Sequence, residues 1–296
     1  MSKLNILLTG ATGFVGQRYV AYNQEKYNIK TVSLQKTVLQ DVDFQGIDTV
    51  VHSAGIAHQM QKIDPKIYFD INFEQTFAFA TAAKEKGVKH FIFLSTIKVF
   101  GEHHTTVLDE NTPCEPINDP YGESKLKAEI GLKNLETSDF IVSIVRPPLV
   151  YGPGVKGNLI RFLHLGNTNY YLPFGGINNK RTMVFLDNLI ELINAITDKK
   201  VNGIFLAGDD RTISTTELIS NIRTVLNKPQ RLFKIPNLFI FLLKKVKPEL
   251  AIRLFGSLEM NTSYTNQRLN HKVPYTVEKG LATMTNWFLE NNNNAK

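Results

Sequence analysis

The chain has 296 residues, of which 43% are hydrophobic and 21% are charged. These proportions describe a globular protein of one or two domains and exclude an intrinsically disordered chain. The formal net charge of +7 favours an anionic partner, although the lysine and arginine residues are scattered and form no dense basic block. We therefore expect no nucleic acid, and the charge leaves an anionic lipid and a phosphorylated small molecule as alternatives.

The content of cysteine and of apolar runs indicates the compartment. Cys114 is the single cysteine, which excludes an internal disulfide, favours a reducing compartment and leads us to expect a cytoplasmic protein. We expect no signal peptide, because the first apolar segment is too short, and no membrane span. The segment LFIFLLKKVK at 238–247 comes nearest to one, and we interpret it as a buried helix with a basic end. Peripheral membrane association is accordingly not expected.

Short apolar runs alternate with helical segments through the first half of the chain. The runs are 4–9, 29–34, 47–55, 90–96 and 140–148, and the clearest helical segments are 72–87 and 121–136. Continuous apolar character suits strands that are buried on both faces, as in a parallel sheet. The alternation predicts an α/β fold with a Rossmann-type, doubly wound parallel sheet.

The pattern also predicts how the chain divides into domains. Between the second and third runs there is too little chain for a full helix-and-strand unit, so one unit of the fold is trimmed. After residue 150 the alternation loosens into glycine-rich loops and mixed helices, which predicts a smaller second domain. We assign residues 1–153 and 181–209 to the domain of the parallel sheet, and residues 154–180 and 210–296 to the smaller domain.

The helical segment 72–87 is apolar on two sides, with Phe77 on one stripe and Phe79 on another. One stripe can cover the sheet. The other needs a partner, which is either another helix of this chain or a second subunit.

A glycine-rich segment, TGATGFVG at 9–16, directly follows the first run and opens a helix. Glycine lets the backbone approach a pyrophosphate closely, and the helix N-terminus then stabilises its charge. A purely structural turn is the alternative, but the position after the first strand favours dinucleotide binding. The cofactor contacts expected here are Gly10, Thr12, Gly13, Phe14, Val15 and Gly16.

The end of the second run should distinguish NAD from NADP. An acidic residue there would bind the ribose hydroxyls of NAD, whereas a basic residue would accept the 2′-phosphate of NADP. The chain has Ser33, Gln35 and Lys36 at this place and no acidic residue. Lys36 is either a phosphate contact or a solvated loop residue, so NADP is favoured over NAD only mildly.

The segment NDPYGESKLKAE at 118–129 predicts a helix that Asp119 caps. Tyr121 and Lys125 are four residues apart, so they project from the same face of this helix. They are either an ordinary surface pair or a phenol whose pKa, ordinarily near ~10, is lowered by the ammonium one turn away.

A hydroxyl group at the sheet edge supports the second interpretation. Thr96 ends the fourth run at the carboxyl edge of the sheet, where ligands bind in such folds. Thr96, Tyr121 and Lys125 would then move a proton to or from an alcohol while a nicotinamide exchanges hydride at the same carbon. No metal is expected, because His103 and His104 are adjacent rather than spaced like ligands on a helix.

Five motifs together resemble the extended short-chain dehydrogenase/reductases of the nucleotide-sugar epimerase/dehydratase group. They are TGATGFVG, VVHSAG, FLSTIKVFGE, YGESK and VRPPLVYGPG, and their order matches over roughly residues 4–290. The resemblance implies that Tyr121 is the acid/base, that Lys125 binds the nicotinamide ribose, and that Thr96 replaces the serine or threonine of the family. It also implies a nucleoside-diphosphate sugar as substrate. Residues 1–153 and 181–209 would then form the NAD(P)-binding Rossmann domain, and residues 154–180 and 210–296 the smaller C-terminal nucleotide-sugar-binding domain.

The resemblance extends to further positions. It implies cofactor contacts at Ala54, Gly55, Asn72 and Pro148. It implies substrate contacts at Asn158, Lys180, Arg181 and Arg253, of which Lys180 and Arg181 are alternatives for one diphosphate-binding residue. Asp187 is expected to cap the helix that follows it.

Within the group, STIKVFGE and RPPLVYGPGVKGN look most like bacterial surface-polysaccharide enzymes. These act at C4 either as reductases of UDP-4-keto-6-deoxy-N-acetylhexosamines, of the UDP-N-acetylquinovosamine or fucosamine type, or as UDP-glucose and UDP-N-acetylglucosamine 4-epimerases. The missing acidic residue and the trimmed unit favour the reductase, which must release its cofactor in every turnover. A non-catalytic dinucleotide-binding scaffold is the remaining alternative, and the resemblance also implies a homodimer.

Overall fold

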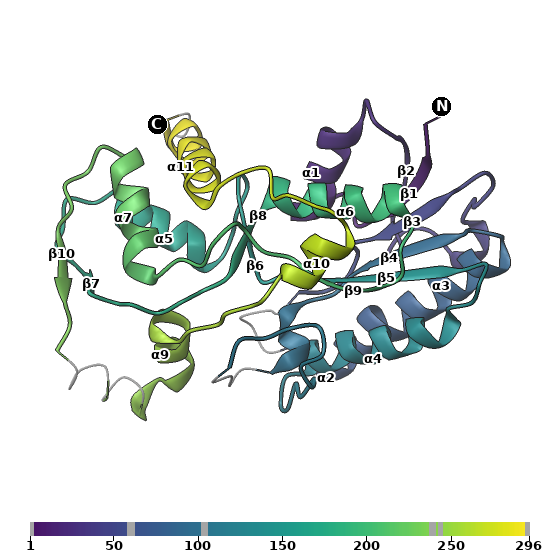
Figure 1. The fold of residues 1–296 in the computed structure, drawn as a ribbon, viewed down its shortest axis with the longest axis horizontal. Helices are drawn as coiled ribbons and strands as arrows, with labels where there is room; N and C mark the ends of the chain where they lie inside the picture. Colours follow the sequence, from purple (N-terminus) through teal and green to yellow (C-terminus); the bar gives the residue numbers. More distant parts are fainter. Residues whose placement is uncertain (1–2, 58–62, 102–105, 237–240, 242–244, 294–296) are drawn as a thin grey trace.

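A parallel six-stranded sheet forms the centre of the computed structural model, which describes residues 3–57, 63–101, 106–236, 241 and 245–293 (Figure 1). Its strands are β1 Asn5–Thr9, β2 Asn28–Val32, β3 Thr49–His52, β4 His90–Leu94, β5 Ile141–Arg146 and β9 Gly203–Leu206. All neighbouring strands are parallel, in the order β2-β1-β3-β4-β5-β9. The Rossmann-type sheet predicted from the apolar runs is confirmed, and β9 shows that the chain returns to it.

The strand order locates the ligand-binding edge. From β1 the chain moves outward to β2 and then returns to the other side of β1, where it forms β3. The direction of winding therefore reverses between β1 and β3, and ligands of open α/β sheets bind at the carboxyl ends of such strands. The predicted trimming is also confirmed: within residues 33–48 the structure has only a 3₁₀ helix, Leu39–Asp41, so β2 is the edge strand.

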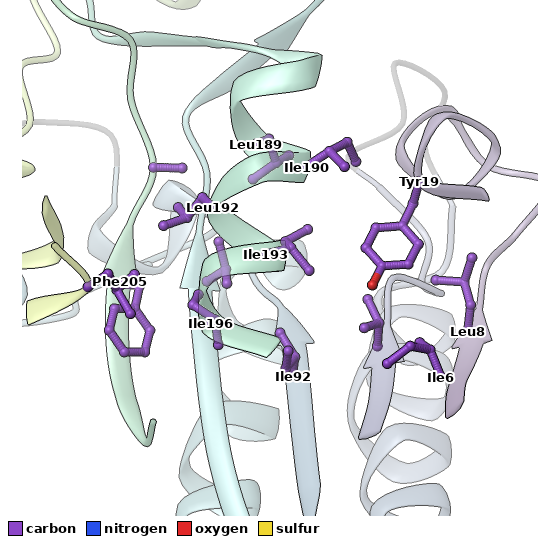
Figure 2. Close-up of a cluster of buried hydrophobic side chains, with 14 of the residues drawn as sticks. Ile6, Leu8, Tyr19, Ile92, Leu189, Ile190, Leu192, Ile193, Ile196 and Phe205 are labelled. Carbon is purple, nitrogen blue, oxygen red and sulfur yellow. The ribbon is translucent and has the colours of Figure 1, made fainter. Parts of the chain in front are cut away.

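Helices cover both faces of the sheet (Figure 1). The helices α1 Phe14–Asn23 and α6 Leu186–Lys199 lie on one face, and α3 Thr76–Glu85 and α4 Pro120–Leu135 lie on the other. In Figure 2, Ile193 and Ile196 of α6 gather with Tyr19 of α1 and with the strand residues Ile6 and Ile92. Burial of these apolar side chains holds the helical layer on the sheet.

The helix predicted at 72–87 begins earlier. A short helix α2, Pro65–Phe69, continues through a π-helical turn, Asp70–Gln75, into α3. Phe79 is buried against the sheet. The second apolar stripe has a partner in this chain, because a Cβ at Gly131 of α4 would lie 3.0 Å from the ring of Phe77.

The remaining chain forms a second layered region beside the sheet. Its elements are β6 Leu149–Tyr151, α5 Asn158–Gly166, β7 Leu172–Gly175, β8 Met183–Phe185, α7 Thr215–Val225, β10 Leu232–Lys234, α9 Pro248–Phe255, α10 Ser263–Arg268 and α11 Val277–Asn293. β6 pairs with β8, and β7 pairs with β10. Phe185, from the stretch that returns to the sheet, belongs to the second core. The domain boundaries given above stay predictions.

Two local predictions are wrong. Asp187 does not cap α6; its carboxylate accepts hydrogen bonds from Arg18 at 2.6 and 2.7 Å and so joins α6 to α1. The stretch 238–247 is not buried at its described positions, because Phe241 is 51% exposed and Val246 is 74% exposed. The positions 238–240 and 242–244 lie outside the described residues. In the described part of the chain, no helix combines the length and the apolar character that crossing a bilayer requires.

Candidate active site

The glycine-rich turn lies at the carboxyl end of β1 and is closed tightly by backbone contacts. The Gly13 amide donates to the Gly10 carbonyl at 2.9 Å, and Gly10 has a φ of +73°. A Cβ at Gly10 would lie 2.7 Å from the Ala54 nitrogen, and one at Gly16 would lie 2.1 Å from the Gly10 oxygen. Side chains are therefore excluded at these positions, as close packing of the turn on β3 and α1 requires.

The first turn of α1 follows this loop directly. Gly13 is the N-cap and provides no side-chain acceptor for the backbone N–H groups of the first turn. Unsatisfied N–H groups at a helix N-terminus form a site for an anion such as a pyrophosphate. Phe14 reaches across to the second region, where a Cβ at Gly154 would lie 3.7 Å from its ring. The turn therefore fits the dinucleotide predicted from the sequence.

The end of β2 is open. Ser33, Gln35 and Lys36 are exposed, and the Lys36 amide donates to the Ser33 carbonyl at 3.0 Å in a turn. Gln75 holds this turn in place by donating to the Leu34 carbonyl at 2.9 Å. The place where the adenosine ribose is expected is thus bounded by one exposed turn rather than by a complete helix-and-strand unit.

Asn72 joins the loop after β3 to α4. Its Oδ1 accepts from the Ile56 amide at 2.8 Å, and its Nδ2 donates to the Ile56 carbonyl and to Ser124 Oγ. A Cβ at Gly55 would lie 2.8 Å from Asn72 Oδ1 and 3.3 Å from Lys125 Nζ. Gly55, Asn72 and Lys125, predicted separately as cofactor contacts, therefore converge at one place.

The predicted helix start carries Tyr121 and Lys125 to the end of β4. Asp119 caps α4 as expected, accepting from the Gly122 amide at 3.2 Å. Thr96 follows β4 and is within hydrogen-bonding reach of the Tyr121 phenol. Lys125 is buried, and its ammonium donates to the Leu94 carbonyl at 2.9 Å. The structure thus brings the three predicted catalytic residues together.

The protonation of this group differs from the prediction. Burial raises the pKa of Tyr121 to about 12, while the contact with Thr96 opposes this rise. The expectation that Lys125 lowers the phenol pKa is wrong for this state, because the loss of hydration outweighs it. Burial also lowers the pKa of Lys125 from 10.5 to about 7, and the nearby carboxylate of Glu129 opposes that change. The phenol therefore holds its proton firmly, and the ammonium is close to titration at neutral pH.

A buried ion pair behind Lys125 was missed from the sequence. Glu129 accepts from Arg146 of β5 at 2.6 Å, and Ser95 also donates to Glu129. Both charged side chains are almost completely buried. The four-residue step from Lys125 to Glu129 was a signal for this pair, but the pattern does not reveal which strand supplies the partner.

His52 is a second unpredicted polar residue beneath the site. It lies between the hydroxyls of Thr9 and Thr76, at 3.1 and 3.0 Å from its two ring nitrogens. Burial and the Lys125 charge lower its pKa to about 3, so the ring is neutral. It supports β3 against the neighbouring helix and carries no charge into the site.

The predicted substrate contacts Asn158, Lys180, Arg181 and Arg253 lie in the second region. Asn158 is exposed as the first residue of α5. Pro148, a predicted cofactor contact, is buried two residues after the end of β5. Lys180 is exposed and pairs with Glu259 at 3.5 Å. Arg181 instead donates to the Gly256 carbonyl at 3.1 Å, at the end of α9. The side chain of Arg253 lies outside the described residues.

Metal ligands are not grouped in the described part of the chain, where no cluster of three or more His, Cys, Asp or Glu side chains could hold an ion. His103 and His104 lie outside the described residues.

The profile of the NAD dependent epimerase/dehydratase family matches residues 6–208, which includes the glycine turn and the Tyr121–Lys125 pair. The chain belongs to this family. A UDP-glucose 4-epimerase of Vibrio cholerae is 35% identical to it over 98% of this chain and 97% of the relative. An N-acetyl-alpha-D-glucosaminyl-diphospho-ditrans,octacis-undecaprenol 4-epimerase of Escherichia coli O157:H7 is 29% identical over 80% of this chain and 75% of the relative.

Solved structures of two other proteins share this fold. UDP-glucuronic acid 4-epimerase of Bacillus cereus, in complex with NAD, has a TM-score of 0.75 at 19% identity and covers 97% of this chain and 99% of its own. RMD of Pseudomonas aeruginosa, complexed with NADPH, has a TM-score of 0.75 at 18% identity and covers 97% and 100%. These two likenesses show the fold. The family match and the Vibrio cholerae relative show that the protein is an enzyme of the NAD dependent epimerase/dehydratase family, which is of the short-chain dehydrogenase/reductase type.

Proposed function

We propose that the enzyme is an NAD(P)-dependent oxidoreductase at C4 of a UDP-sugar, and that it reduces a UDP-4-keto-6-deoxy-N-acetylhexosamine for surface polysaccharide. The open edge beside β2 carries this proposal. A reductase must exchange its cofactor in every turnover, and the exposed turn at Ser33–Lys36 leaves the adenosine end accessible. The resident nicotinamide dinucleotide, when bound, supplies the hydride.

The protein side of this reaction is a proton transfer. Thr96 orients the C4 oxygen, and the Tyr121 phenol donates a proton to it as the ketone becomes an alcohol. Because burial raises the pKa of Tyr121 to about 12, the phenol is protonated at neutral pH and can donate this proton. Lys125, whose ammonium donates to the Leu94 carbonyl, contacts the ribose and places a positive charge in the site.

We place the nucleotide diphosphate between the N-terminus of α5 and the end of α9. Asn158 offers its amide there. Lys180 and Arg181 stay alternatives for the diphosphate contact, because Lys180 pairs with Glu259 and Arg181 donates to the Gly256 carbonyl at the end of α9. Arg253 on α9 remains a third candidate. NADP is preferred over NAD through Lys36, and a homodimer forms through the outer side of α3 and α4.

Epimerisation at C4 is the second candidate, because the Vibrio cholerae relative is a UDP-glucose 4-epimerase matched over nearly its whole length. The same triad would serve it, but an epimerase retains NAD and returns the hydride to its own substrate. The cofactor content of the purified protein separates the two: we expect little bound nicotinamide and no interconversion of UDP-glucose and UDP-galactose without added cofactor. Stoichiometric bound NAD with such interconversion would favour the epimerase.

A further inference from the structure

The short β7–β10 sheet displays aromatic side chains to solvent. Tyr170 is 75% exposed and Tyr171 is 69% exposed, immediately before β7, and Phe233 of β10 is about half exposed. Large aromatic side chains that gather on a surface mark an interaction site, in contrast to single exposed apolar residues. We call Tyr170, Tyr171, Arg231, Phe233 and Lys234 the β7–β10 patch.

One cation of the patch, Arg231, lies over one of its aromatic rings. Leu172 pairs with Leu232 in the sheet, which brings the two halves of the patch together. The Arg231 guanidinium lies 5.4 Å from the centre of the Tyr171 ring and donates to the Asn169 carbonyl at 2.9 Å. Lys234 lies beside Gly176, where a Cβ would be 3.4 Å from its side chain.

The patch has a fixed backbone. Arg223, which is completely buried, donates to the Tyr170 carbonyl at 2.6 Å and to the Pro229 carbonyl at 2.7 Å. These bonds tie the segment before β7 to the segment before β10. The exposed rings are therefore presented by an anchored backbone.

The net charge of the chain originates in this part of the sequence. Residues 218–248 contain seven lysine and arginine residues and no aspartate or glutamate, so the remaining 27 basic and 27 acidic residues balance. The basic residues themselves are spread along the chain, and it is the acidic ones that are missing here. This segment therefore attracts anions even though no dense basic block is present.

The exposed character continues beyond β10. Phe241 and Val246 are exposed, and the Lys245 ammonium lies 4.7 Å from the centre of the Phe241 ring. Lys247 is also exposed. Exposed aromatic and aliphatic side chains beside lysine and arginine are the composition of segments that lie in a membrane interface.

We propose that the β7–β10 patch docks the enzyme on the surface of an anionic phospholipid bilayer. Each lysine or arginine near such a surface contributes about 1 kcal/mol of attraction, and the rings insert at headgroup level. The proposal differs from the expectation, drawn from the sequence, of no peripheral association, and the experiment below tests the two against each other. Figure 1 places β7 and β10 at the end of the molecule opposite β2 and α3, so docking there leaves the six-stranded sheet clear of the bilayer.

Lipid is favoured over nucleic acid by the exposed aliphatic side chain of Val246, which lies outside the β7–β10 patch in the segment that follows β10. Val246 is a side chain that a bilayer interface accommodates, whereas a phosphate backbone gains nothing from it. The proposal does not depend on which C4 reaction the enzyme performs.

Sedimentation of the full-length protein with vesicles tests the proposal. One set contains phosphatidylcholine alone, and the other contains phosphatidylcholine mixed with phosphatidylglycerol. We expect binding to the anionic set that weakens with added salt, and little binding to the neutral set. Arg231→Glu/Lys234→Glu should weaken binding by about thirtyfold or more, and Tyr171→Ser/Phe233→Ser should weaken it without changing the charge.

The matched control is Lys86→Glu/Lys89→Glu, which makes the same charge change at two exposed lysines near the start of β4. This control should bind vesicles as the unmodified protein does. Circular dichroism and thermal melting verify that every variant folds. If a double variant does not fold, the single variant Tyr171→Ser replaces it. Equal loss in the control and patch variants would overturn the proposal. It would also be overturned if the unmodified protein did not bind vesicles and the patch variants instead lost binding to duplex DNA or lost self-association.

Discussion

Glu129 and Arg146 form a buried ion pair one helical turn behind Lys125, with 2.6 Å between Glu129 Oε2 and Arg146 Nη2. Glu129 also accepts from Ser95, the residue before Thr96. One carboxylate thus connects the helix that carries Tyr121 to the ends of the two strands beside it. The relative position of phenol and threonine hydroxyl depends on this connection.

Substitution of one partner should therefore destabilise the protein strongly. In Glu129→Gln a buried guanidinium loses its counter-charge, and we expect the free energy of unfolding to fall by about 3–5 kcal/mol. Urea unfolding measures the change. Glu129→Gln/Arg146→Met also removes the uncompensated guanidinium charge, so part of the lost stability should return. If the double variant lost as much free energy of unfolding as the two single variants together, the pairing would be contradicted.

Ser95→Ala offers a milder test of the same connection. It removes a donor to Glu129 but leaves the ion pair, so we expect the free energy of unfolding to fall by about 1–2 kcal/mol. Because Thr96 is the next residue, kcat should fall more than the cofactor Kd rises. An unchanged kcat in a folded Ser95→Ala protein would show that Glu129 does not position the threonine.

The glycine turn makes a steric prediction. Gly16→Ala would place a methyl group 2.1 Å from the Gly10 carbonyl, so the turn must open. We expect at least a tenfold loss of NADPH affinity, measured by the fluorescence of the bound cofactor. Gly46→Ala is the matched control: Gly46 has a φ of +69° and open space around it, so only backbone strain of about 1 kcal/mol should appear. Equal losses of NADPH affinity in Gly16→Ala and Gly46→Ala would refute the role of the glycine turn in cofactor binding.

Lys125 makes the stability depend on pH in a defined direction. Its pKa is about 7 in the folded protein and 10.5 without burial, so between these values the unfolded chain binds a proton that the folded one does not. Protonation thus favours unfolding, and the cost of burying Lys125 disappears as the pH rises from about 7 toward 10.5. Relative to Lys125→Met, the unmodified protein should gain stability over this range in urea titrations. A difference that does not vary with pH would show that the ammonium is not desolvated.

Replacing the Tyr121 phenol with a plain ring separates its role in proton transfer from any role in cofactor binding. Tyr121→Phe keeps the buried ring and removes the proton, so turnover should fall about 10²–10⁴-fold while NADPH affinity stays nearly unchanged. Stopped-flow turnover and fluorescence titration measure the two. Full turnover in Tyr121→Phe would remove the phenol from the proton transfer.

The sequence predicts the sheet well because β1, β3, β4 and β5 lie in apolar runs, and burial on both faces leaves that mark directly. The edge strand β2 is largely exposed and was predicted from its short β-branched run. The catalytic triad follows because Tyr121 and Lys125 have a helical spacing and Thr96 ends a strand. The Glu129–Arg146 pair was missed because its partners come from different elements. The rise in the pKa of Tyr121 was also missed, because loss of hydration depends on the complete three-dimensional surroundings rather than on the neighbour one turn away.

Residues of the second region were predicted less well for a similar reason. Lys180 and Arg181 are adjacent, and only the fold shows that one pairs with Glu259 while the other holds the end of α9. The apolar stretch at 238–247 has a composition that suits a core and a surface equally, and its described positions are exposed.

The central claim is reduction at C4, and one assay tests it most directly. The protein is incubated with a UDP-4-keto-6-deoxy-N-acetylhexosamine and NADPH or NADH, and loss of the reduced cofactor's absorbance is followed together with the product. The account predicts one cofactor oxidised for each 4-hydroxy sugar formed, faster with NADPH. No oxidation of either cofactor, with interconversion of C4-epimeric UDP-sugars by the same preparation, would contradict it.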